Sequence, residues 1–285
     1  IENLLAYADA MSHKNEKSAA GKAYLTLYRT TDNDEFREIA FHGVKEFPSP
    51  EAYKIILADL DMDNLSEVSI DTLIALNAML DPAEHPAEVA LLRTAMLDAA
   101  RTPTHVQSIL DMAHQQGVGS EVVAMMGFVT RWHLIGPFPW SSGEGFDANP
   151  VNAPQIDLNA TYSVGDQQRT WKQHTTGQIV NAIGLLGQHG NVSLYAYANI
   201  QSVENTDAQI RLGSDDGVRV WLNGESVHEN NIDRGMLLDQ DIVPVKLKKG
   251  NNELLVQITQ GGGGWGFMLR FTKMDGSPIP TGVKN

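Results

Sequence analysis

No cysteine occurs among the 285 residues of the chain. This absence excludes structural disulfides, thiolate metal sites and cysteine nucleophiles. No apolar run reaches the roughly 18 residues that a membrane-spanning helix needs, so the sequence predicts no transmembrane segment. The chain begins at Ile1 and carries no basic-then-apolar leader. We therefore expect a mature or trimmed product, and removal of a signal peptide is one way to obtain it.

The usual catalytic signatures are also missing from the sequence. The nine histidines are scattered and form no His-Glu-x-x-His zinc motif, and no Gly-x-Ser-x-Gly nucleophile elbow occurs. A run of four glycines at 261–264 is followed by a predicted strand and lacks the Lys-Ser or Lys-Thr pair of a phosphate-binding loop. These absences predict a protein that is not an enzyme.

Positive charge is scarce, because 21 Lys and Arg face 35 Asp and Glu, for a net charge of −14. The imbalance belongs to the first half. Residues 1–127 hold 9 basic and 20 acidic side chains, whereas residues 128–285 hold 12 and 15. A surface of this sign repels phosphate backbones, so we expect no nucleic-acid partner.

The first half has helical periodicity from about residue 18 to residue 126. Pro50 and Pro86 lie 36 residues apart, each in the first turn of a predicted helix and each followed by similar apolar spacing. This spacing loosely resembles HEAT or armadillo repeats, and an irregular helical bundle is the alternative. We assign residues 1–127 to an all-α, solenoid-like domain.

The second half changes to a period of two, with more glycine and more aromatic residues. Eight short strands separated by polar turns favour an antiparallel β-sandwich of the jelly-roll kind over residues 128–285. The whole chain is thus predicted to be an α+β multidomain protein. The predicted strands are 130–135, 178–183, 192–201, 208–212, 217–222, 241–247, 252–260 and 266–272.

An acidic turn within this half is the best candidate for a site. Asp215, Asp216 and Gly217 precede an alternating strand at 218–222, and Asn223-Gly224 closes that strand with a strong hairpin signal. Two adjacent carboxylates can bind a hard cation or accept hydrogen bonds from sugar hydroxyls. They can equally cap the turn and do nothing else. Both interpretations are open at this point.

Three segments carry a resemblance to known domains: 214–224, with the acidic turn and hairpin, 132–138 (Trp-His-Leu-Ile-Gly-Pro-Phe) and 249–258, where a Lys-Gly-Asn turn precedes an apolar strand. They resemble protective-antigen-type and galactose-binding-like lectin β-sandwiches of secreted bacterial proteins. The resemblance covers about residues 128–285. It implies that Asp215 and Asp216 hold a calcium ion that binds sugar hydroxyls, with Asn223 as a further ligand.

Trp265 follows the four glycines directly. If the indole lies exposed at the tip of this loop, it offers a platform on which a sugar face can stack. If it packs inward, it belongs to the core. With Asp215, Asp216 and Asn223, it completes the predicted ligand-binding set.

The function that these features favour is non-catalytic binding of carbohydrate by a secreted, periplasmic or cell-surface protein. One rival is a structural or assembly protein, in which the helical half docks a protein partner. Another is an accessory region of a glycoside-active or other enzyme whose catalytic domain lies outside this chain. Fold alone does not decide between them.

Overall fold

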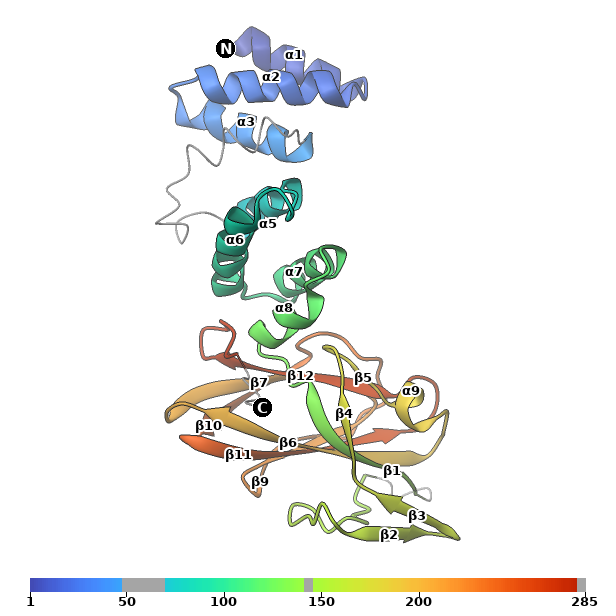
Figure 1. The fold of residues 1–285 in the computed structure, drawn as a ribbon. Coiled ribbons are helices and arrows are strands. Elements are labelled where there is room, and N and C mark those ends of the chain that lie inside the picture. Colours follow the sequence, from blue (N-terminus) through green and yellow to red (C-terminus); the bar gives the residue numbers. More distant parts are fainter. Residues whose placement is uncertain (48–69, 141–145, 281–285) are drawn as a thin grey trace. The chain divides into compact units, whose positions relative to one another are not determined.

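A computed structural model of the chain describes residues 1–47, 70–140 and 146–280 (Figure 1). The chain divides into two compact units, Ile1–Ala100 and Arg101–Asn285. None of the helices in the described ranges is long and apolar enough to cross a bilayer. The helix expected after Pro50 falls outside these ranges.

The first unit is entirely helical in its described parts. Neighbouring helices pack together within the set α1 to α3, and α5 packs on α6. Asn33 caps α3 by accepting a hydrogen bond from the backbone N–H of Phe36, and Pro86 opens α6 as its position predicted. The repeat-like arrangement stays a prediction. The helices are α1 (Glu2–His13), α2 (Lys17–Thr30), α3 (Asp34–Glu46), α5 (Ile70–Met79) and α6 (Pro86–Ala99).

The second unit opens with two helices, α7 (Pro103–Gln115) and α8 (Gly119–Met125). Thr102 caps α7 and Pro103 fills its first turn. The periodicity of the sequence places the domain boundary after residue 127, but these two helices belong to the same compact unit as the sheets. Arg101, just before α7, pairs at 3.6 Å with Asp275, which follows the last strand.

Antiparallel sheets make up the rest of this unit, as the period of two predicted. A six-stranded sheet has the order β4-β1-β6-β11-β8-β9, a four-stranded sheet the order β10-β7-β12-β5, and β2 pairs with β3 alone (Figure 1). The strands are β1 (Arg131–Pro139), β2 (Thr161–Val164), β3 (Gln167–Thr170), β4 (Lys172–Thr175), β5 (Val180–Asn181), β6 (Val192–Ser202), β7 (Thr206–Asp215), β8 (Val218–Leu222), β9 (Glu225–Asn230), β10 (Asp241–Leu247), β11 (Gly250–Gln260) and β12 (Gly266–Lys273); a short helix, α9 (Ala182–Leu186), follows β5.

The six-stranded sheet buries apolar side chains on both faces. One face packs in the main core, which includes Trp132, Leu254 and Phe267. The other face carries a second cluster with Tyr195 and Trp171. This two-sided burial explains why most of β6 and the second half of β11 are buried at consecutive positions, whereas β10 alternates between buried and exposed residues.

Candidate functional site

The acidic turn lies where the chain leaves β7 and enters β8. Asp215 is the last residue of β7, and the Asp215–Asp216 peptide bond is cis. The turn is tied to the end of β11, because the Asp216 N–H donates to the Thr259 carbonyl and the Thr259 N–H donates to that of Gly217. The turn is therefore held by the strand beside it.

The Asp216 carboxylate caps two nearby backbone segments. Its Oδ2 accepts from the Gly261 N–H at 2.8 Å, and its Oδ1 accepts from the Arg234 N–H at 3.3 Å. Only 7% of the residue is exposed. The turn-capping interpretation of Asp216 is thus realised in the structure, and this carboxylate joins the glycine loop to the segment after β9.

Negative charge is concentrated around the turn. Burial raises the pKa of the Asp215 carboxyl, and the neighbouring carboxylates of Asp216 and Asp233 raise it further. Burial also raises the pKa of Asp216, although the hydrogen bonds from Gly261 and Arg234 oppose the shift. Hard oxygen donors that repel one another are the kind of group that a cation stabilises. Within the described ranges, however, no three His, Asp or Glu side chains come together as metal ligands.

Asn223 does not join this turn, so its predicted role as a further calcium ligand is wrong in this structure. The five residues of β8 separate it from the acidic pair, which at about 3.3 Å per residue is more than 15 Å of extended chain. Its side chain instead accepts from the Glu253 N–H and donates to Asn252.

Trp265 packs inward. It is 3% exposed and belongs to the main core, with its ring edge-on to His189. Of the two interpretations of this residue, the core one therefore holds, and the exposed stacking platform is wrong. The glycine loop also packs closely on the acidic turn, because a Cβ atom at Gly264 would lie 2.3 Å from the Asp215 carboxylate.

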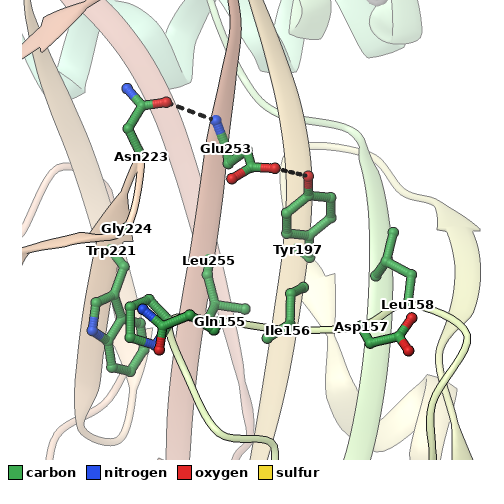
Figure 2. A pocket seen from close by; sticks show the side chains of 11 residues that line it. Gln155, Ile156, Asp157, Leu158, Tyr197, Trp221, Asn223, Gly224, Glu253 and Leu255 are labelled. Carbon is green, nitrogen blue, oxygen red and sulfur yellow. Dashed lines mark hydrogen bonds between the residues drawn. The ribbon is translucent and has the colours of Figure 1, made fainter.

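A pocket that the sequence did not reveal lies on the outer face of the six-stranded sheet. It has a volume of about 480 Å³ and is bounded by the sheet and by residues 154–158 (Figure 2). Its floor follows a row across three strands, because Tyr197 pairs with Leu255 and Leu255 pairs with Trp221. Asn223, at the end of β8, lines the same pocket.

Polar groups surround this apolar row. The Tyr197 hydroxyl donates to Asn199 at 2.8 Å and lies 3.3 Å from the Glu253 carboxylate. Burial, the charge of Glu253 and their hydrogen bond raise the pKa of Tyr197 to about 12, so the hydroxyl stays protonated at neutral pH. Figure 2 shows this hydrogen bond together with the one from the Glu253 backbone to Asn223.

The pocket was missed because its parts come from distant segments. Trp221 and Tyr197 each lie within a run of consecutive apolar residues, 220–222 in β8 and 194–198 in β6, so these runs do not distinguish the two faces of the sheet. Nothing local indicates that residues 154–158 return to cover this face. The one available signal is the pair of aromatic residues at positions that become neighbours once β8, β11 and β6 align.

No protein-family model and no curated protein sequence matches the chain. Solved structures with a similar arrangement include a β-glucosidase from Kluyveromyces marxianus in complex with glucose, at 17% identity and a TM-score of 0.34, with 49% of this chain and 16% of that chain covered. A PA14 sugar-binding domain from an RTX adhesin matches at 13% identity and a TM-score of 0.31, over 53% and 94% of the two chains. A family 35 carbohydrate-binding module from Clostridium thermocellum matches at 14% identity and a TM-score of 0.25, over 34% and 88%.

Proposed function

We propose that this protein binds carbohydrate without chemical turnover, and that the pocket of Tyr197, Trp221 and Glu253 is the binding site. The observation that carries the proposal is the pocket's composition. An apolar row with two aromatic residues lies beside an exposed carboxylate and an amide, in a volume of about 480 Å³. Small-molecule sites have this size and combine apolar surface with polar groups that orient the ligand.

Each part of the pocket has a separate task in this proposal. The two aromatic side chains contribute apolar surface against which the C–H groups of a sugar ring pack. The Glu253 carboxylate and the amides of Asn223 and Gln155 exchange hydrogen bonds with its hydroxyls. Tyr197 fixes Glu253 by its hydroxyl hydrogen bond. The predicted secreted, periplasmic or cell-surface location would bring such a site to extracellular glycans.

A glycan array followed by titration calorimetry of the best ligand tests this site. Replacing Glu253 with Gln should weaken binding about tenfold, because a hydrogen bond to a charged group contributes roughly 1.5–3 kcal/mol. Glu204→Gln is the matched control, since Glu204 is exposed and does not line the pocket. Absence of any sugar ligand, or equal effects of the two substitutions, would refute the assignment.

Calcium at the acidic turn is a second proposal, supported by the concentration of carboxylates around Asp215 and Asp216. Both would supply oxygen ligands, and Asp216 would exchange part of its capping role for the ion. Thermal unfolding of the full chain in EDTA and in millimolar calcium tests it. A calcium-dependent rise in melting temperature that Asp215→Asn abolishes would support the site, whereas identical melting would leave Asp216 as a turn cap.

The assembly alternative makes a different prediction for the same protein. If the helical half docks protein partners or further copies, light scattering should show association that grows with concentration. If the proposed sugar site is the main function, the molar mass should stay constant while glycan binding persists.

A further inference from the structure

A second pocket of the Arg101–Asn285 unit has the opposite electrostatic character to the rest of the chain. It has a volume of about 510 Å³ and lies beside β1, at the edge of the six-stranded sheet that β4 forms. β3 and the end of α9 form its other sides. The residues that line it are Leu134, Ile135, Gly136, Pro137, Gln167, Gln168, Arg169, Thr170, Lys172, His174, Leu185, Leu186 and His189.

Basic side chains dominate the polar part of this lining. Arg169, Lys172, His174 and His189 converge on the pocket, whereas the described lining residues include no Asp or Glu. In a chain with 35 acidic and 21 basic residues, such a local excess is opposite to the overall balance. The lining therefore carries the formal positive charges of Arg169 and Lys172 and no formal negative charge, in a chain whose net charge is −14.

The charges around the pocket are not neutralised by ion pairs with carboxylates. Within the described part of the chain, none of the four basic side chains takes part in a salt bridge. Arg169 is held by neutral acceptors, since its Nη2 donates to Gln167 at 2.6 Å and its Nε to the Pro137 carbonyl at 3.4 Å. These contacts orient the guanidinium without neutralising its charge.

Partial burial strengthens the electrostatic interactions of the Arg169 guanidinium with a ligand. Arg169, His174 and His189 are each only partly exposed, whereas Lys172 is exposed at the mouth. A charge at a partly enclosed wall is less screened by water than one on an open surface. Leu185, Leu186 and Pro137 add apolar surface for the body of a ligand.

We propose that this pocket binds a small anionic ligand through a carboxylate, sulfate or phosphate group, with Arg169 and Lys172 as the main contacts. Guanidinium and ammonium groups form charge-assisted hydrogen bonds with such oxyanions. The inference concerns a different pocket from the proposed sugar site and does not depend on it. One protein could then bind a neutral sugar and an anion on separate parts of the same sandwich.

Titration calorimetry of the full chain at low ionic strength tests the proposal with four probes: glucuronate, glucose 6-sulfate, inorganic phosphate and glucose. We expect at least one anion to bind about tenfold or more tightly than glucose, and its affinity to fall as sodium chloride is added. The three anions distinguish a carboxylate from a sulfate or phosphate group as the recognised chemistry.

Two substitutions locate the binding. Lys172→Glu should weaken the anion at least about fivefold, since it reverses a charge at the pocket mouth. Lys246→Glu is the control, because Lys246 is an exposed lysine outside this pocket and should leave the affinity within about twofold. Arg169→Gln should also weaken binding, and melting curves establish that each variant is folded.

The result also separates this proposal from the sugar site. Glu253→Gln should leave anion binding unchanged, even if it abolishes binding of a neutral sugar. The anion proposal is overturned if none of the three anions binds more tightly than glucose, or if Lys172→Glu and Lys246→Glu have equal effects.

Discussion

At the scale of single residues, the buried carboxylate of Asp239 is the clearest case of a side chain that holds the sandwich together. It pairs with Arg211 at 3.2 Å and with Arg270 at 2.6 Å, and the Arg270 side chain has no exposed surface. Asp239 follows β9 and precedes β10, in a segment without apolar periodicity, so nothing local predicts that its carboxylate is buried. The structure shows that its single carboxylate pairs with two guanidinium groups, one from β7 and one from β12.

Replacing Asp239 with Ala should lower the free energy of unfolding by about 3–5 kcal/mol, because it leaves buried guanidinium groups without their counter-charge. Urea denaturation measures this loss. Asp207→Ala is the matched control, since Asp207 pairs with Lys246 on an exposed surface and should cost no more than about 1 kcal/mol. Equal losses for the two variants would mean that the buried pairs contribute no more than an exposed one.

At the scale of elements, sequence periodicity predicts the strands that carry a local apolar pattern. It misses the strands that form only because a neighbouring strand pairs with them. The strands at 192–201, 241–247 and 252–260 correspond to β6, β10 and β11. In contrast, β2, β3, β4 and β9 were missed, because they are short, largely exposed and polar. Such segments become strands through their partners, and four to six residues are too short for an apolar alternation to mark them in the sequence.

The same limit explains the outcome for the predicted site. Asp215 and Asp216 are adjacent in sequence, so their proximity was certain. Asn223 was assigned to them from a resemblance, but the five residues of β8 separate it from the acidic turn. Whether the Trp265 side chain points into the core or toward solvent depends on how the glycine loop connects β11 to β12. The sequence of the loop alone does not determine this.

The segment after β9 packs closely on β7, and Gly213 makes this approach possible. A Cβ atom at Gly213 would lie 1.8 Å from the Leu237 carbonyl oxygen. Gly213→Ala should therefore displace the segment and lower the free energy of unfolding by about 1–3 kcal/mol, as overpacking does. Gly235→Ala is the control in the same segment, because nothing lies within 4 Å of its Cβ position. Urea denaturation of both variants checks the difference, and a stable Gly213→Ala protein would show that the segment can move.

At the scale of the whole molecule, the boundary between the two compact units does not coincide with the position where the sequence changes from helical to strand periodicity. Helical periodicity continues to about residue 126, yet the second compact unit begins at Arg101. Backbone hydrogen bonds connect the residues just after α8 to β12, since the Phe271 N–H donates to the Gly127 carbonyl and the Val129 N–H donates to the Leu269 carbonyl. The segment that joins α8 to β1 is thus hydrogen-bonded to the sandwich, and α7 and α8 belong to the same compact unit as the sheets.

This division predicts how fragments of the chain behave. A fragment of residues 101–285 should fold with a single cooperative transition, because it contains a complete compact unit. A fragment of residues 128–285 should melt several degrees lower, since it loses α7, α8 and the Arg101–Asp275 pair. Calorimetry of the two fragments measures the difference, and circular dichroism checks that both retain their sheets. If the shorter fragment melts at the same temperature as the longer one, α7 and α8 do not stabilise the sandwich. The boundary of the stable folding unit then lies after residue 127.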